Sequence, residues 1–330
     1  MSSTLLRSVD FFDLHPEPGD LRAEVLAGLR RMPKSLPPKL FYDQTGSKLF
    51  EKITALPEYY PTRAEIATLE ACAPEIARLA GDGCVLIEYG SGSSRKIRIL
   101  LDALNGRCQY VAIDISRQQL SESTARLAAE YPAIDAIAVC ADYTRPFELP
   151  AETLTAAGRR IVFFPGSTIG NFTPPEAKEF LTNTARQIGP NGGLLIGVDL
   201  KKDRATLEAA YNDSQGVTAQ FNRNLLTHIN RTVGADFEPA SFRHCAFYNE
   251  SAGRIEMHLV SLRDQLVTVA GERIPFRQAE SIHTENSYKF SIEEFQQLGR
   301  DSGFRPERAW TDAGNLFSVH YMTVADSLSA

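Results

Sequence analysis

The chain has 330 residues, of which 43% are hydrophobic and 23% are charged, as in ordinary globular proteins. Such a composition argues against disordered, collagen-like and coiled-coil proteins. Lys and Arg number 35 against 41 Asp and Glu, and the sequence has no long block of like charge, so neither nucleic acid nor an anionic membrane is an expected partner. Because single cores stop growing at roughly 250–300 residues, we expect two lobes.

The N-terminal region and the cysteines indicate the compartment. Residues 1–13 include Arg7, Asp10 and Asp13, and no later stretch approaches the roughly 18 apolar residues of a membrane span. The five cysteines are scattered without a Cys-x-x-Cys spacing, which indicates reduced thiols. We therefore expect a soluble, cytoplasmic protein. We also expect it to work as a monomer. The six histidines show no His-Glu-x-x-His pattern, so we expect no metal site.

From about Ala64 the sequence alternates short apolar runs with amphipathic stretches, which is the pattern of a parallel sheet covered by helices. The expected strands are Cys84–Tyr89, Gln109–Ile113, Ala136–Cys140, Arg160–Phe164 and Gly193–Val198. The expected crossover helices are Lys96–Leu104, Gln118–Glu130 and Pro174–Ile188. This region is predicted to be a doubly wound, Rossmann-like α/β domain.

The flanking segments have a different pattern. A helix is predicted at Asp20–Arg31, with Asp20 as its N-cap. After the α/β region, the expected elements are a long helix from Asp203 to about Ile229, strands at Arg254–Ser261, Gln265–Val269 and Tyr288–Phe290, a helix opened by the capping box Ser291–Glu294, and a last strand at Leu316–Val324. We therefore expect one domain of residues 63–199 and 291–330, and a second, α+β lobe of residues 1–62 and 200–290.

The strongest local signal is a glycine turn after the first expected strand, in the run from Val85 to Lys96. Gly90 and Gly92 allow the backbone to approach a ligand at the carboxyl end of this strand. A dinucleotide fold requires a third small residue where this chain has Arg95. The turn fits better the looser pattern of enzymes that bind S-adenosylmethionine (SAM), although a glycine turn without a ligand would look similar.

Acidic residues follow the next two expected strands. Asp114 ends the second strand, where a carboxylate can accept hydrogen bonds from both hydroxyl groups of a ribose. An acid that only caps a helix or a turn could occupy the same position. Asp142 and Tyr143 follow the third strand, where an acid can bind the adenine amino group and an aromatic ring can stack on the base. Three such features at successive strand ends favour a nucleoside-containing cofactor.

The loop after the fourth expected strand, Phe163–Phe172, contains Pro165, Gly166 and Gly170, which force irregular backbone beside the ligand crevice. Asn171 offers both a donor and an acceptor in this loop. Its side chain could equally bond to its own backbone, as loop asparagines often do.

Several motifs along the chain resemble those of a known protein family. They are Phe41-Tyr-Asp, Gly46-Ser-Lys-Leu-Phe-Glu, Leu56-Pro-Glu-Tyr-Tyr-Pro-Thr-Arg63, Phe164-Pro-Gly-Ser-Thr-Ile-Gly-Asn171, the run Tyr211–Asn222, Arg254-Ile-Glu-Met-His258 and the run Thr284–Phe290. Together they resemble the L-histidine Nα-methyltransferases of ergothioneine biosynthesis, over about residues 36–324. That family uses SAM to trimethylate the α-amine of histidine, giving hercynine. The resemblance therefore implies the same cofactor and substrate here.

The resemblance also implies roles for individual residues. Those that would contact SAM are Gly90, Lys96, Asp114, Asp142 and Tyr143. Those that would contact the amino acid are Tyr59, Asn171, Tyr211, Met257, Glu285, Asn286 and Ser287. Within this set, Asn171 and Tyr211 would hold the carboxylate, Glu285, Ser287 and Tyr59 would address the imidazole, and Met257 would line the side-chain pocket, while Tyr42 would lie near the amine. No residue is an evident catalytic acid or base, so Tyr42, Asn171 and Tyr211 are expected to act by positioning the substrate.

Three other functions stay open at this point. The first is SAM-dependent methylation of another amino acid or small amine. The second is a nicotinamide-dependent dehydrogenase, against which Arg95 and the lack of a hydride-relay histidine argue. The third is a SAM-binding regulator without catalytic activity, which the intact set of substrate residues disfavours.

Overall fold

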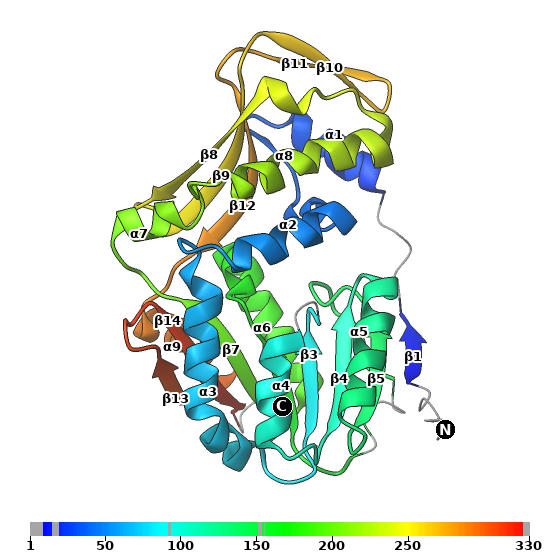
Figure 1. The fold of residues 1–330 in the computed structure, drawn as a ribbon, viewed down its shortest axis with the longest axis vertical. Coiled ribbons are helices and arrows are strands. Elements are labelled where there is room, and N and C mark those ends of the chain that lie inside the picture. The colour runs from blue at the N-terminus through cyan, green and yellow to red at the C-terminus, as the bar shows by residue number, and fades with distance from the viewer. Residues whose placement is uncertain (1–8, 15–19, 92–93, 151–153, 155, 326–330) are drawn as a thin grey trace.

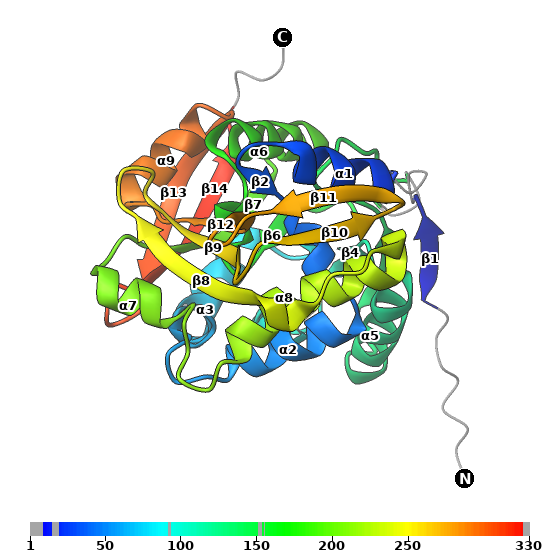
Figure 2. The same ribbon diagram turned by 90° about the horizontal axis from the view of Figure 1, so that it is seen from above.

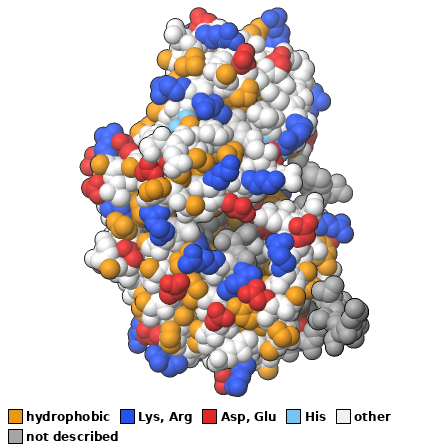
Figure 3. Space-filling model, viewed as in Figure 1, with side chains coloured by type: hydrophobic (Ala, Val, Ile, Leu, Met, Phe, Trp, Pro, Cys, Tyr) orange, Lys and Arg blue, Asp and Glu red, His pale blue; other side chains and the backbone are white. Residues whose placement is uncertain are grey.

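The computed structural model describes residues 9–14, 20–91, 94–150, 154 and 156–325. These residues form an eight-stranded sheet, a four-stranded sheet and a two-stranded hairpin (Figure 1). The eight-stranded sheet lies in the lower part of Figure 1, and the four-stranded sheet with the hairpin lies above it. Figure 3 shows side chains of both charge signs interspersed over the viewed face.

The large sheet has the strand order β1-β5-β4-β3-β6-β7-β14-β13. Its strands are β1 (Asp10–Asp13), β3 (Val85–Tyr89), β4 (Gln109–Asp114), β5 (Asp135–Cys140), β6 (Arg160–Phe164), β7 (Gly193–Asp199), β13 (Phe304–Thr311) and β14 (Phe317–Val324). Strands β1 to β7 within it run parallel, and β14 is antiparallel to both β7 and β13. Every residue of β3 and β7 is buried, because helices cover both faces of the sheet.

Helices α3 (Tyr60–Ala80), α4 (Ser94–Ala103) and α5 (Arg117–Glu130) cover one face, and α6 (Pro174–Ile188) and α9 (Ile292–Arg300) cover the other. The capping box of α9 is present, since Ser291 Oγ accepts from the Glu294 N–H at 3.1 Å and the Glu294 carboxylate accepts from the Ser291 N–H at 2.7 Å. The doubly wound, Rossmann-like architecture predicted from the sequence is confirmed.

The four-stranded sheet has the order β2-β12-β9-β8. Its strands are β2 (Lys34–Ser35), β8 (Phe242–Asn249), β9 (Arg254–Ser261) and β12 (Ser281–Tyr288); β10 (Gln265–Val269) and β11 (Glu272–Phe276) form the hairpin. Helices α1 (Leu21–Arg30), α2 (Gln44–Thr54), α7 (Arg204–Ala209) and α8 (Val217–Ile229) accompany it (Figure 2). All four helices contribute buried side chains to one apolar core that they share with the sheet. Short 3₁₀ turns at Pro38–Phe41, Thr168–Asn171 and Pro239–Ser241 and a π-helical turn at Asn230–Gly234 complete the described elements.

Two expectations about the flanking segments differ from the structure. The helix expected from Asp203 to Ile229 is broken into α7 and α8. Gly216 adopts a φ of +69°, and the Asp213 carboxylate accepts from the N–H groups of Val217 and Thr218 at 2.8 and 2.7 Å, which starts a new helix there. The strand expected at Tyr288–Phe290 is the end of the longer β12, beyond which Phe290 forms only an isolated bridge with Leu200.

The N-terminal segment contributes to both sheets. The N-cap expected at Asp20 is confirmed, since its carboxylate accepts from the Ala23 N–H at 3.0 Å. The preceding strand β1, however, pairs in parallel with β5 and forms the edge of the large sheet. Residues 10–13 therefore lie with the Rossmann-like sheet, although we expected residues 1–62 in the other lobe. Four residues are too short a run for periodicity to indicate where they pair.

Candidate active site

The residues expected to hold the cofactor lie at the carboxyl ends of β3, β4 and β5. Gly90 has a φ of +77°, which favours glycine, and a Cβ at this position would lie 3.5 Å from the Tyr143 hydroxyl. Tyr143 stacks on Tyr89 with ring centroids 5.5 Å apart and planes 6° apart. The glycine therefore keeps the space in front of this aromatic pair open. Gly92 lies outside the described residues.

The two acids of this region are held in place by local hydrogen bonds. The Asp114 carboxylate accepts from the Ser116 N–H at 2.8 Å, and burial raises its pKa above the ordinary value. The Asp142 carboxylate accepts from the Thr144 N–H at 3.0 Å and faces the Arg145 guanidinium at 3.7 Å. Each acid thus keeps acceptor capacity for a ligand while its orientation is fixed.

Lys96 is buried in α4 and forms an ion pair with Glu65 of α3. Both oxygens of Glu65 also accept from the Gly166 N–H, at 2.9 and 3.0 Å. Glu65 therefore connects the α4 lysine to the loop after β6. Beside them, burial raises the pKa of Glu88 to about 8, although a hydrogen bond from Tyr110 opposes the shift.

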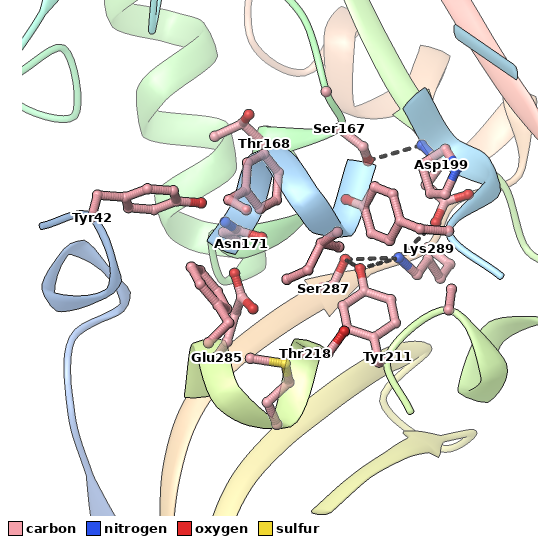
Figure 4. A pocket seen from close by; sticks show the side chains of 18 residues that line it. Tyr42, Ser167, Thr168, Asn171, Asp199, Tyr211, Thr218, Glu285, Ser287 and Lys289 are labelled. Carbon is pink, nitrogen blue, oxygen red and sulfur yellow. Dashed lines mark hydrogen bonds and ion pairs between the residues drawn. The ribbon is translucent and has the colours of Figure 1, made fainter. Parts of the chain in front are cut away.

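The residues expected to contact the amino acid converge on one cavity between the two sheets (Figure 4). The expected residues that line it are Tyr42, Tyr59, Asn171, Tyr211, Met257, Glu285 and Ser287. Asn286 does not line it, because side chains alternate along β12 and its neighbours Glu285 and Ser287 occupy the cavity face. The Asn286 Oδ1 atom is buried and accepts no hydrogen bond from the described residues.

Aromatic rings form one wall of the cavity. Phe50 and Phe221 both lie edge-on to Tyr42, with ring centroids 6.0 and 6.1 Å from it, and Tyr59 lies edge-on to Phe50 at 6.3 Å. Tyr42 is 47% exposed, so it stands at the mouth of the cavity. Aromatic faces of this kind stabilise a cation placed against them.

A β-bulge positions Glu285 in the cavity. The pairing of β12 with β9 shifts register between His283 and Glu285, and the Thr284 hydroxyl bonds to the Met257 carbonyl at 3.0 Å. Bulges commonly re-aim side chains beside active sites. Burial raises the pKa of Glu285 to about 7, against the opposing effect of Lys289. No described residue donates a hydrogen bond to its carboxylate, which leaves this group available to a ligand.

A polar network that the sequence did not reveal adjoins Ser287 and Tyr211. Their hydroxyl groups are hydrogen-bonded at 2.8 Å, and Lys289 Nζ lies 2.7 Å from Ser287 Oγ and 3.2 Å from the Tyr211 oxygen (Figure 4). Lys289 is itself paired with Asp199 at 2.7 Å. Asp199 ends β7 as Asp114 ends β4, so an acid at a strand end was the available signal for this residue. Lys289 stands in the motif run Thr284–Phe290, but nothing in the sequence indicated its contacts.

One cluster outside the cavity contains residue types that bind metals. The ligand atoms of Glu256, His258 and His283 lie within 4.8 Å of one another. Glu256 is already paired with Arg254 at 2.7 Å, and the two imidazole rings are stacked 12° from parallel at 4.7 Å. Lone pairs in the planes of stacked rings do not converge on one point, so this arrangement is an ion-paired stack and not a chelate.

The glycine turn after β3, the acids at the carboxyl ends of β4 and β5, and the adjoining cavity define a class, the Rossmann-like, SAM-dependent methyltransferases. A family model described as histidine-specific, SAM-dependent methyltransferase matches residues 21–324, and the chain belongs to this family. It is 43% identical over 304 residues to the histidine N-alpha-methyltransferase of Mycolicibacterium smegmatis, covering 91% of this chain and 93% of the relative. It is 33% identical over 311 residues to ergothioneine biosynthesis protein 1 of Neurospora crassa, covering 92% of this chain and 35% of the relative.

A more distant relative has a different amino-acid substrate in its name. The chain is 26% identical over 341 residues to the 4-dimethylallyltryptophan N-methyltransferase of Claviceps purpurea, covering 96% of this chain and 98% of the relative. No helix in the described part of the chain is both long and apolar enough to cross a bilayer.

Proposed function

We propose that this enzyme transfers three methyl groups from SAM to the α-amine of L-histidine, giving hercynine for ergothioneine biosynthesis. The observation that carries this proposal is the juxtaposition, in one cavity, of Glu285 and Ser287 with Asn171 and Tyr211. The first pair supplies an acidic and a hydroxyl group for a ring with two nitrogens, and the second supplies donors for a carboxylate. Membership of the histidine-specific family supports the same substrate.

The cofactor would be held by Gly90, Lys96, Asp114, Asp142 and Tyr143. These residues fit it, because Gly90 leaves space in front of Tyr143 and the Asp114 carboxylate has capacity to accept two ribose hydroxyl groups. When bound, SAM supplies an electrophilic methyl group.

The side chains of the cavity would act by positioning and desolvation. The nucleophile must be a neutral amine, and an α-amine with a reference pKa of about 7.7–8.0 loses its proton at neutral pH at a cost of about 1 kcal/mol. A strong base is therefore unnecessary, and the polar groups of the cavity would act by clamping the carboxylate and the ring. The rings of Tyr42 and Phe50 would favour the cationic product through their faces.

The organisation of the chain supports a self-contained enzyme. We propose a cytoplasmic monomer, since one chain supplies residues from α2, the loop after β6, α8 and β12 to the same cavity and none of the five cysteines, all of which the structure describes, forms a disulfide. We propose that residues 63–199 and 291–330 form the methyltransferase domain, to which strand β1 adds an edge strand. The rest of residues 1–62 and residues 200–290 would form the substrate-binding lobe.

Mass spectrometry of the product tests the reaction. After incubation with SAM, L-histidine should gain three methyl groups, and fragmentation should place all of them on the α-nitrogen. Histamine serves as the matched control, because it keeps the ring and the amine but lacks the carboxylate that Asn171 and Tyr211 would hold. Methylation of the imidazole, or equal turnover of histamine, would contradict the proposal.

A second candidate is methylation of another amino acid, favoured by the relative named for a tryptophan derivative. Phenylalanine and tryptophan belong in the same assay. A higher kcat/KM for either of them than for histidine would establish this alternative.

A further inference from the structure

Asn222 of α8 is completely buried and follows Phe221, which lines the cavity, but Asn222 itself does not line it. Its Nδ2 atom lies 2.9 Å from His244 Nδ1 of β8 and 3.1 Å from the backbone oxygen of His258. Its Oδ1 atom lies 2.9 Å from the Thr284 hydroxyl of β12. Both N–H groups and the oxygen of this amide therefore have partners within the protein. Any influence of Asn222 on a ligand must pass through these neighbours.

The partners of Asn222 determine where the hydrogens lie. The His258 backbone oxygen can only accept, so the amide nitrogen faces it, and the second N–H of the amide donates to His244 Nδ1. His244 therefore carries its hydrogen on Nε2, which donates to the Tyr211 backbone oxygen at 2.9 Å. Burial lowers the pKa of His244, which favours this neutral ring. The reverse orientation of the amide would place two pairs of acceptors against each other.

The oxygen of the same amide reaches the β-bulge of β12. Thr284 lies where the pairing of β12 with β9 shifts register, and its side chain is buried. Its hydroxyl hydrogen lies between two acceptors, Asn222 Oδ1 at 2.9 Å and the Met257 carbonyl at 3.0 Å, as in a three-centre hydrogen bond. This bond ties the bulge to both α8 and β9. Because Glu285 is the next residue, the attachment fixes the direction in which its side chain leaves the strand.

We propose that Asn222 is a positioning residue that sets the spacing between the two halves of the substrate site. One connection runs through His244 to Tyr211. The other runs through Thr284 to Glu285. This inference rests on the proposed function, in which Tyr211 holds the carboxylate of the substrate and Glu285 contacts its ring.

The two connections leave the proposed substrate contacts intact. They use the backbone carbonyl of Tyr211 and the hydroxyl of Thr284, so the Tyr211 O–H and the Glu285 carboxylate both stay available to the substrate. A fixed spacing favours an amino acid whose carboxylate and ring are separated as in histidine. A misplacement of about 1 Å in such a site can cost roughly 100-fold in rate.

Three ligands distinguish the two connections. L-Histidine has both the carboxylate and the imidazole, L-phenylalanine has the carboxylate with an apolar ring, and histamine has the imidazole without the carboxylate. Their dissociation constants are measured by calorimetry in the presence of S-adenosylhomocysteine.

The first two variants each break one connection. Thr284→Val keeps the shape of the side chain but removes the hydroxyl, so L-histidine and histamine should bind about fivefold or more weakly, while L-phenylalanine stays within about twofold. His244→Phe keeps a ring but removes both nitrogens, so L-histidine and L-phenylalanine should bind about fivefold or more weakly, while histamine stays within about twofold. A general loosening of the lobe would weaken all three ligands alike.

Asn222→Ala removes both connections at once. L-Histidine should bind roughly 20-fold or more weakly, and the other two ligands should each lose the one contact they share with it. Asn230→Ala is the matched control at the end of the same helix. The Asn230 side chain bonds to the Phe237 backbone at 2.7 and 2.9 Å and does not line the cavity. It should lower the midpoint of thermal unfolding, as Asn222→Ala does, but leave all three dissociation constants within about twofold.

Two results would overturn the proposal: Asn222→Ala binds the three ligands as Asn230→Ala does, or Thr284→Val and His244→Phe each weaken all three ligands alike. These two variants leave the amide in place, so they keep the proposal testable if Asn222→Ala does not fold. The wild-type enzyme separates this inference from the proposed function. If it binds L-histidine no better than L-phenylalanine, the proposed substrate is wrong, whereas a wild-type preference that is unchanged in Asn222→Ala refutes only the role of Asn222.

Discussion

Gly197 of β7 lies directly against Glu65 of α3: a Cβ built on Gly197 would be 2.2 Å from Glu65 Oε1. The same carboxylate forms the ion pair with Lys96 and accepts from the Gly166 N–H. Because Gly197 has no side chain, the sheet leaves room for the buried carboxylate of Glu65. This carboxylate connects α4 to the loop after β6 in the cofactor region.

Replacing Gly197 by Ala should displace Glu65 and disturb its bonds to Lys96 and Gly166. Overpacking of a buried site typically costs about 1–3 kcal/mol, so we expect a lower midpoint in thermal unfolding and weaker SAM binding by calorimetry. Gly271→Ala is the control, because Gly271 has a φ of +86° and a Cβ added there would have no atom within 4 Å. It should lose stability through backbone strain and keep its SAM affinity. Unchanged SAM affinity in Gly197→Ala would show that the Glu65 network does not support the cofactor site.

Asp114→Ala should weaken SAM binding about tenfold or more. A hydrogen bond to a charged acceptor contributes roughly 1.5–3 kcal/mol, and the Asp114 carboxylate is the group expected to accept from the ribose. Calorimetric titration with SAM measures the change. Asp82→Ala, which alters an acid at the opposite edge of the sheet just before β3, should bind SAM like the wild type. Tighter binding of NAD than of SAM, or an unaffected Asp114→Ala variant, would contradict the cofactor assignment.

Glu285→Ala should shift the substrate preference away from histidine. Loss of the ring contact is expected to cost histidine roughly 2–4 kcal/mol in kcat/KM, whereas phenylalanine and tryptophan lose little or gain. Adding Met257→Val enlarges the pocket beside Glu285 and should move the preference further toward tryptophan. The measurement is kcat/KM for the three amino acids, with Glu293→Ala, an exposed acid of α9, as the control. If histidine keeps its lead in every variant, the ring does not bind at Glu285.

Stability as a function of pH gives a test of Glu285 that does not depend on activity. Burial raises its pKa to about 7, so between about pH 4.5 and 7 the folded protein binds a proton that the unfolded chain has released. Stability from this residue is therefore complete at low pH and is lost as the pH rises through 7. Glu285→Gln should remove this loss and be more stable than the wild type at pH 8 by about 1–3 kcal/mol, but not at pH 4.5.

Urea unfolding at the two pH values measures this difference, and Glu256→Gln provides the opposite case. Burial would raise the pKa of Glu256, but hydrogen bonds from Arg254, Asn249 and His258 hold it at about 2. Glu256→Gln should therefore be less stable than the wild type at pH 8. A Glu285→Gln variant that is equally destabilised there would show that the Glu285 carboxylate has a partner in the folded protein.

The sequence by itself determined the features that depend on neighbouring residues. Periodicity placed the core strands, and the strand-end positions of Gly90, Asp114, Asp142 and Tyr143 followed, because parallel strands bring their carboxyl ends to one edge. The capping box at Ser291 was equally local. The motif pattern as a whole also predicted the family that the comparisons show.

The tertiary structure decided every feature that depends on contacts between distant segments. The contacts of Lys289 form only where β12, β7 and the turn after α7 bring Ser287, Asp199 and Tyr211 within reach of one ammonium group. The pairing of β1 with β5 and the orientation of Asn286 away from the cavity likewise follow from register and chain path. Local propensity contains no information on which residues far apart in the chain will meet, because packing of whole elements against one another fixes those distances.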